Sequence, residues 1–192
     1  MSIIQHDLII QKARPVHASR LSAVLTAGFF DDPVFRWAMP HDARRRGALP
    51  ELFDAFVAGF APLDETYTTG TVAGTALWAP PGTAAELELD DAWLAEWPRM
   101  AQVVGALEST HPHEPCWYLN LLAVEPSAQG NGIGSALLRA VTDQADAQGA
   151  PCYLEATSDD NRRLYERHGF VATAAILPGD DCPPLWAMWR RP

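Results

Sequence analysis

Apolar positions along the chain follow two different periods, and the switches between them divide the sequence into predicted helices and strands. Apolar side chains recur at helical spacing over residues 16–30 and 44–60, and again after Gly132. Runs rich in β-branched and aromatic residues over 65–69, 71–79 and 117–124 instead favour strands, the first two joined as a tight hairpin about Gly70. Helices and strands therefore alternate along the chain, which predicts an α/β protein.

The remaining elements are shorter. Pro15 ends a first strand at 7–14, and Asp32 before Pro33 is typical of the start of a short helix. Residues 83–108 are predicted as helix interrupted at Pro98; a strand at 152–156 and a helix from Asp159 and Asp160 to Gly169 follow. Residues 170–176 and 184–189 form a last pair of strands. The whole chain, 1–192, is predicted to be a single domain with a mixed sheet of about seven strands and helices on both faces.

The most informative stretch runs from Trp117 to Leu138. A strand breaks at Pro126, and Gly130, Gly132 and Gly134 then lead into a helix with one apolar stripe. The first N–H groups of a helix have no intrahelical acceptor, and the helix dipole is positive there, so this turn suits a pyrophosphate. A glycine-rich connection that binds nothing is the alternative.

Two phosphate-binding motifs fit this turn poorly. A P-loop needs a lysine at the helix start, and the only lysine of the chain is Lys12. A dinucleotide fingerprint fails at its last position, where Ser135 or Leu137 stands, although Glu155 follows where a ribose-binding acid is expected. A nucleotide-dependent oxidoreductase is therefore a weakened alternative.

The spacing Q-x-x-G-x-G, from Gln129 to Gly134, resembles the acetyl-CoA signature of the GNAT superfamily of N-acetyltransferases. The strand before it and the segment NRRLYERHGF at 161–170 after it resemble the fourth strand and the tyrosine-bearing last helix of that family. Within the family, the strings EPCWYL, QGNGIGSA and YERHGF look most like the puromycin N-acetyltransferase group. The resemblance implies the GNAT fold, a mixed twisted sheet that splays at its central strand, and acetyl-CoA as co-substrate.

It also implies which residues bind acetyl-CoA. The backbone of the central strand would pair with the pantetheine amides, and the glycine turn would hold the pyrophosphate. Asn161 is a further candidate, with helix capping as its structural alternative. The candidates are Leu122, Ala123, Val124, Gln129, Gly130, Asn131, Gly132, Ile133, Gly134, Ser135, Asn161 and Tyr165.

Acetyl transfer to an amine needs an acid for the departing thiolate and a base for the ammonium. Tyr165 is the expected acid, because a tyrosine with an ordinary pKa near 10 stays protonated at neutral pH and can donate to a thiolate whose thiol has a pKa near 8.5. Glu155 is the expected base; Glu125 and a chain of water molecules are alternatives. The catalytic candidates are thus Tyr165 and Glu155.

The expected acceptor is the primary amine of a small molecule, with an antibiotic-like or aminonucleoside compound suggested by the puromycin-type resemblance. In GNAT enzymes the segment between the first helices commonly walls the acceptor pocket, so Asp31, Asp32, Phe35 and Trp37 are substrate-side candidates by resemblance. A capping acid and core aromatics are the structural alternative. A peptide or protein amine acetyltransferase and a non-catalytic acyl-CoA-binding module stay open as functions.

Composition limits the classes of partner that the chain is expected to bind. The formal net charge of −10, spread along the chain, argues against nucleic acid, since phosphate neutralisation needs a basic surface. No apolar run is long enough to span a membrane, and the first residues do not resemble a signal peptide. Three cysteines without a C-x-x-C pair fit reduced thiols in the cytoplasm, and no metal site is expected. A homodimer is retained as an option that the sequence does not decide.

Overall fold

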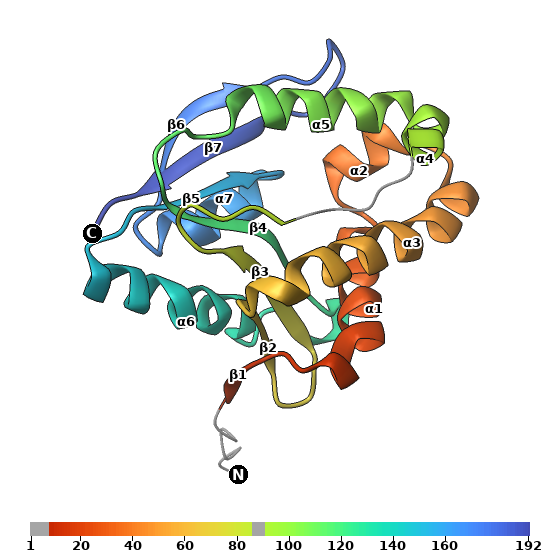
Figure 1. Cartoon of the computed structure of the whole chain (residues 1–192). Coiled ribbons are helices and arrows are strands. Elements are labelled where there is room, and N and C mark those ends of the chain that lie inside the picture. The colour runs from red at the N-terminus through yellow and green to blue at the C-terminus, as the bar shows by residue number, and fades with distance from the viewer. Residues whose placement is uncertain (1–7, 86–90) are drawn as a thin grey trace.

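The computed structural model describes residues 8–85 and 91–192 and contains one seven-stranded sheet (Figure 1). The strand order is β1-β2-β3-β4-β5-β7-β6, and every neighbouring pair is antiparallel except β4 and β5. The strands are β1 (Ile10–Lys12), β2 (Thr66–Thr69), β3 (Gly74–Ala79), β4 (Trp117–Val124), β5 (Cys152–Ala156), β6 (Val171–Ile176) and β7 (Leu185–Arg190). The predicted mixed sheet of seven strands is confirmed.

Helices cover both faces of this sheet. One core gathers side chains from α1 to α5, and the other gathers side chains from α6 and α7. The helices are α1 (Ala18–Phe29), α2 (Pro33–Ala38), α3 (Asp42–Phe60), α4 (Asp91–Glu96), α5 (Pro98–Thr110), α6 (Ile133–Gln148) and α7 (Asp159–Glu166), with 3-10 turns η1 (Pro15–His17), η2 (Ala61–Leu63) and η3 (Pro126–Ala128). Figure 1 shows α5 above β6 and β7 and α6 at the opposite side of the molecule.

Several predicted boundaries were wrong. The hairpin is not tight about Gly70: β3 begins at Gly74, because the Thr69 hydroxyl accepts a hydrogen bond from the Ala73 N–H at 2.9 Å and holds a wider turn. Ser158, not Asp159 or Asp160, caps α7, and that helix ends at Glu166 rather than at Gly169.

Two other predicted elements are shorter than expected. The first strand covers only Ile10–Lys12, and residue 7 lies outside the described residues. Within the predicted helix at 83–108, residues 83–85 are irregular, 86–90 lie outside the described residues, and the interruption falls at Trp97, just before Pro98.

The central strand β4 changes register at Asn120. Leu119 pairs with Trp78 on β3 and Leu121 pairs with Leu77, so Asn120 has no residue opposite it. Because a bulge inverts the alternation of side chains, Trp117 and Leu119 face α6 and α7 whereas Leu121 and Ala123 face α1.

At the same point the sheet opens. β5 pairs with β4 only from Trp117 to Leu119, so the rest of β4 diverges from β5. This is the splay that the family resemblance implies at the central strand.

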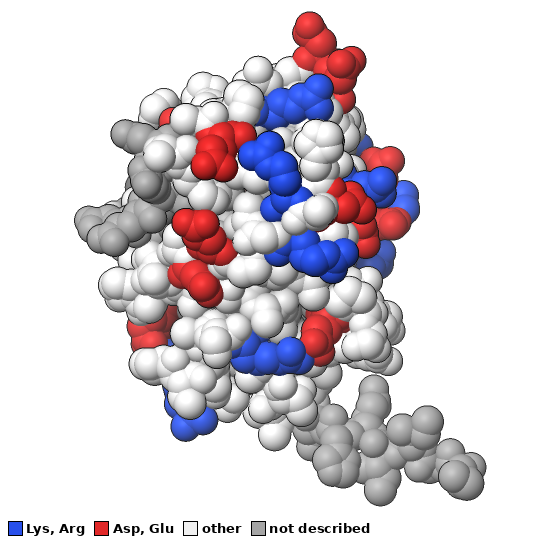
Figure 2. Space-filling model, turned by 90° about the vertical axis from the view of Figure 1, so that its right-hand side faces the viewer, with Lys and Arg blue, Asp and Glu red and all other residues white. Residues whose placement is uncertain are grey.

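Charged side chains are mixed on the surface. On the face shown in Figure 2, basic and acidic groups are interspersed rather than separated into one-sign patches. Arg44 and Glu96, and Arg20 and Glu125, form ion pairs at 3.6 and 2.6 Å. Among residues 8–85 and 91–192, no helix is long and apolar enough to cross a membrane.

Candidate active site

A polar groove follows the diverging half of β4 and ends at the start of α6. Ten of the twelve predicted cofactor-binding residues line it, and the other two, Asn131 and Tyr165, do not. Tyr165 instead lines an adjoining cavity. The predicted residues in the groove are Leu122, Ala123, Val124, Gln129, Gly130, Gly132, Ile133, Gly134, Ser135 and Asn161.

The glycine turn shapes this groove through its backbone. Gly130 and Gly132 have φ of +78° and +79°, a conformation that residues with a Cβ rarely adopt. The turn thereby leads into α6, whose first N–H groups carry the positive end of the helix dipole. A Cβ at Gly134 would lie 3.3 Å from Leu164, so this glycine lets α6 approach α7 closely.

The polar side chains of the turn donate hydrogen bonds to nearby backbone carbonyls. The Gln129 amide donates to the Val124 carbonyl at 3.2 Å, and the Asn131 amide donates to the carbonyls of Ala128 and Gln129. These contacts fix the turn against the end of β4, which leaves ligand binding to backbone N–H groups.

Six residues of the groove were not among the candidates from the sequence, and two of them bear directly on its shape and charge. Gly28 of α1 lies so close to β4 that a Cβ there would stand 2.8 Å from the Ala123 Cβ, and only the fold brings them together. Arg167, just after α7, lines the groove and offers a cation for phosphate groups. It stands in the string YERHGF, so its spacing from Tyr165 was an available signal.

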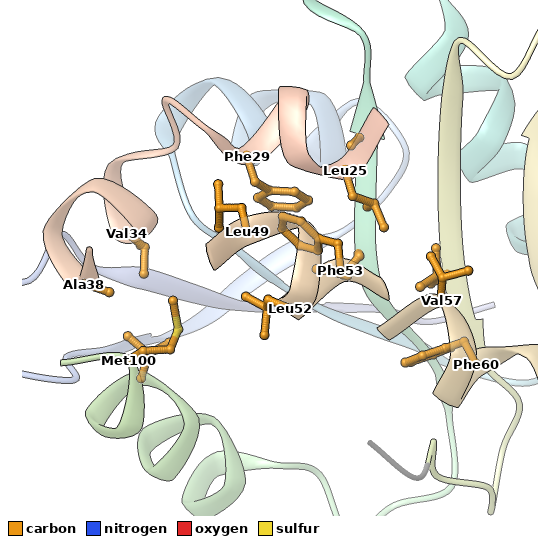
Figure 3. Packing of buried hydrophobic residues seen from close by; sticks show 14 of the residues in the cluster. Leu25, Phe29, Val34, Ala38, Leu49, Leu52, Phe53, Val57, Phe60 and Met100 are labelled. Carbon is orange, nitrogen blue, oxygen red and sulfur yellow. The ribbon is translucent and has the colours of Figure 1, made fainter. Parts of the chain in front are cut away.

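An apolar cavity of about 160 Å³ lies next to the groove, and Phe29, Leu122 and Asn161 line both. Figure 3 shows Phe29, Leu52 and Met100, three of its lining side chains, directed from α1, α3 and α5 into the space between these helices. Its polar lining residues, Tyr118, Asn120, Glu155, Thr157, Asn161 and Tyr165, come from β4, from β5 and the loop after it, and from α7. The cavity therefore has an apolar body and a polar side toward the sheet.

Glu155 is the acid on that polar side. Its Oε2 accepts a hydrogen bond from the Tyr118 hydroxyl at 2.8 Å, and its buried Oε1 has no partner among the described residues. Burial raises the pKa of the Glu155 carboxyl to about 7, against the smaller opposing effects of the neighbouring Tyr118 and Tyr153 hydroxyls. The group therefore exchanges a proton near neutral pH.

Tyr165 lies in the same cavity and is 6% exposed. Burial raises the pKa of its hydroxyl, and the negative charge of Asp32 raises it further. The hydroxyl consequently stays protonated at neutral pH, as an acid requires.

The four substrate-side candidates lie in different places. Phe35 lines the cavity, whereas Asp31 and Trp37 line neither the cavity nor the groove. Asp31 is exposed, and the Trp37 ring packs against the Arg99 guanidinium, whose carbon lies 5.0 Å from the ring centroid. Asp32 borders the groove, but its Oδ1 accepts from the N–H groups of Val34 and Phe35 and its Oδ2 from the Thr157 hydroxyl. Those bonds favour the capping interpretation of Asp32.

The alternative base, Glu125, lies elsewhere. Its carboxylate accepts from the Arg20 guanidinium at 2.6 Å, and it lines neither the groove nor the cavity. Among the described residues, no group of three or more His, Cys, Asp or Glu side chains is arranged for a metal ion.

The diverging strands β4 and β5, the glycine turn at the start of α6 and the adjoining apolar cavity form the arrangement expected of an acyl-CoA-dependent transferase. The model of the Acetyltransferase (GNAT) family matches residues 49–170, and the chain belongs to that family. It is therefore an N-acetyltransferase, of a family whose enzymes use acetyl-CoA as co-substrate.

Individual relatives agree with this. An uncharacterised N-acetyltransferase of Schizosaccharomyces pombe is 26% identical over 202 residues, which cover 90% of this chain and 79% of that protein. A solved structure from Corynebacterium glutamicum, described as histone acetyltransferase HPA2 and related acetyltransferase, is 29% identical with a TM-score of 0.71 and 95% of each chain covered. The Drosophila melanogaster polyamine N-acetyltransferase shares the fold, with a TM-score of 0.68 at 16% identity over 97% of this chain and 100% of that one.

Proposed function

We propose that the enzyme transfers the acetyl group of acetyl-CoA to the primary amine of a small molecule, by direct attack of the amine on the thioester. The observation that supports this proposal most directly is that the groove adjoins the apolar cavity, and that Glu155 and Tyr165 both line this cavity. A cavity of about 160 Å³ suits a small acceptor better than a peptide.

The cofactor side of the site fits a CoA pyrophosphate. The N–H groups of Ile133, Gly134 and Ser135 at the start of α6 offer donors to phosphate oxygens, and Arg167 adds a positive charge. The half of β4 that has left β5 offers unpaired backbone to the pantetheine amides.

The acceptor side supplies the two proton transfers. An aliphatic amine arrives as an ammonium, and the Glu155 carboxylate takes one proton from it, leaving the nitrogen lone pair free to attack the carbonyl carbon. As the carbon–sulfur bond breaks, the Tyr165 hydroxyl donates a proton to the sulfur. The nitrogen of the tetrahedral intermediate still carries two protons, and it gives one of them to the Tyr165 phenolate as the intermediate collapses. The products are the N-acetyl amine, CoA thiol and the proton held by Glu155, which passes to solvent.

Relatives support an amine acceptor without choosing one. The Drosophila relative is described as forming N-acetylagmatine, and the Corynebacterium relative as a histone acetyltransferase and related enzyme. A test panel should therefore contain polyamines, aromatic amines and a histone-tail peptide. Puromycin is added because of the sequence resemblance.

The test measures amine-dependent release of CoA thiol in wild type, Tyr165→Phe and Glu155→Gln. We expect small amines to accelerate release, and each substitution to lower kcat by at least about tenfold, since general acid or base catalysis contributes roughly 10²- to 10⁴-fold. The dissociation constant for acetyl-CoA should stay unchanged in both variants. Acetyl-CoA binding without release by any amine would favour an acyl-CoA-binding module, and release by the peptide alone would favour a protein acceptor.

A further inference from the structure

The cavity beside Glu155 has a chemical character of its own. Most of its lining is aliphatic or aromatic, supplied by α1, α2, α3, α4, α5 and β4. Its volume of about 160 Å³ is close to the roughly 150 Å³ at which an apolar cavity holds a single benzene ring. A single apolar group of about the size of a benzene ring fills such a space.

The cavity accommodates one positive charge. Among the described residues that line it, Glu155 is the only carboxylate. Asp32 lies on the groove side, and its oxygens already accept from Val34, Phe35 and Thr157. Among the described lining residues, a second ammonium group carried by the same acceptor would find no second carboxylate, and burying an unpaired charge is costly.

Trp93 adds a second polar requirement. It is 8% exposed, lines the cavity from α4, and its indole Nε1 is buried with no hydrogen-bond partner among the described residues. Its ring packs against Trp97 with centroids 6.2 Å apart. A buried N–H without an acceptor is unfavourable, so a ligand oxygen at this position would remove a penalty that the free enzyme carries.

The two polar groups come from different walls of the cavity. Trp93 lines it from α4 and Glu155 lines it from β5, two elements that Figure 1 shows apart from each other. Apolar side chains such as Leu52, Met100 and Val103 also line the cavity. An acceptor that satisfies both polar groups has its amine at one end and a hydrogen-bond acceptor at the other.

We propose that the acetyl acceptor is a monoamine whose planar apolar body carries a hydrogen-bond-accepting oxygen, with the amine at Glu155 and the oxygen at the Trp93 indole N–H. This rests on the proposed function and names its substrate class. Diamines and guanidino amines should be poor acceptors, because the described residues that line the cavity offer no partner for a second cation.

The test compares kcat/KM for 4-methoxyphenethylamine, its near-isostere 4-ethylphenethylamine, putrescine and agmatine. Wild type should prefer the methoxy over the ethyl compound by about fivefold, the size of one hydrogen bond. Putrescine and agmatine should be at least about tenfold poorer than the methoxy compound.

Two variants locate the effect. Trp93→Phe keeps an aromatic ring but removes the N–H, so the methoxy-to-ethyl ratio should fall to about one through loss of that hydrogen bond. Trp97→Phe is the matched control, since Trp97 contacts Trp93 but does not line the cavity, and it should keep the wild-type ratio. Retained acetyl-CoA binding shows that each variant is folded; if Trp93→Phe is not, the wild-type preferences alone decide.

The outcomes separate the two proposals. A ratio that Trp93→Phe leaves unchanged, or diamines used as well as the aromatic monoamines, would overturn the acceptor class while leaving the transferase function intact. Failure of every amine to release CoA would overturn both.

Discussion

Glu155 retains its proton to about pH 7 because burial makes the carboxylate costly. If it takes the ammonium proton, it must be ionised in the free enzyme. We therefore expect kcat/KM to rise with pH through about 7 and then level off, and we expect this limb to be absent in Glu155→Gln. A pH–rate profile with saturating acetyl-CoA measures it.

Tyr118 provides the matched variant for that profile. Its hydroxyl donates to Glu155 Oε2 and so stabilises the ionised carboxylate. Tyr118→Phe removes this bond, so the limb should move to higher pH, by up to about one unit. A limb that stays in place, or moves to lower pH, would contradict the assignment of that limb to Glu155.

At single positions, the sequence identified groups with an obvious chemistry and missed those defined by surroundings. Glu155 and Tyr165 stand at the end of a strand and inside a recognisable string, and the structure puts both in one cavity. Trp93 and Tyr118 are ordinary aromatic residues in sequence; the missing partner of one and the hydrogen bond of the other depend on packing. Asp31 and Trp37 were named from their place in the chain, and they lie outside the cavity.

At the scale of one element, the effects of the two left-handed glycines at the ends of α6 on stability and on cofactor binding can be distinguished. Gly132 precedes the helix at φ +79° and Gly149 follows it at φ +64°, and an added Cβ has open space at both. Replacing either with alanine should lower stability by about 1 kcal/mol through backbone strain. Only Gly132→Ala should raise KM for acetyl-CoA, by several-fold, because it lies in the groove.

Urea unfolding together with KM measurements on both variants checks this prediction. Equal KM values for Gly132→Ala and wild type, with a comparable loss of stability in the two variants, would remove the turn from the cofactor site. A rise in KM for Gly149→Ala would show that the effect is not local to the groove.

Elements with strong periodicity were predicted well, and their irregularities were not. The helical stripe after Gly132 gave α6, and Gly149 ends it as predicted. The register change at Asn120 left no sign, because Trp117–Val124 reads as a continuous β-forming run whichever face each residue takes. Ser158 caps α7 although two aspartates follow it, since only the serine hydroxyl lies within reach of the Asn161 N–H, at 3.2 Å.

Across the whole molecule, the two halves of the site differ in how much sequence they span. The cofactor groove is largely a contiguous stretch from Leu122 to Ser135, so its residues were predictable from one motif. The acceptor cavity is assembled from six helices and three strands between Phe29 and Leu185, and apolar helix positions there are indistinguishable from core positions. The cofactor was therefore accessible from sequence, and the acceptor class depended on the fold.

Burial of Glu155 also makes the stability of the folded protein depend on pH. Its carboxyl has a pKa of about 7 when folded and an ordinary value of 4.5, so the folded state binds this proton more tightly than the unfolded state does. The free energy of unfolding should therefore fall as pH rises from about 4.5 to 7, and the cost of the buried charge persists above that.

Glu155→Gln cannot ionise, and its amide oxygen can still accept a hydrogen bond from Tyr118. Compared with wild type, the variant should gain roughly 1 to 3 kcal/mol between pH 4.5 and pH 8, measured by urea unfolding at both values. Asp32, whose pKa burial also raises, is present in both proteins and cancels in the difference. A difference that is the same at both pH values would mean that water reaches Glu155, and the cavity would then be too wet to select an apolar acceptor.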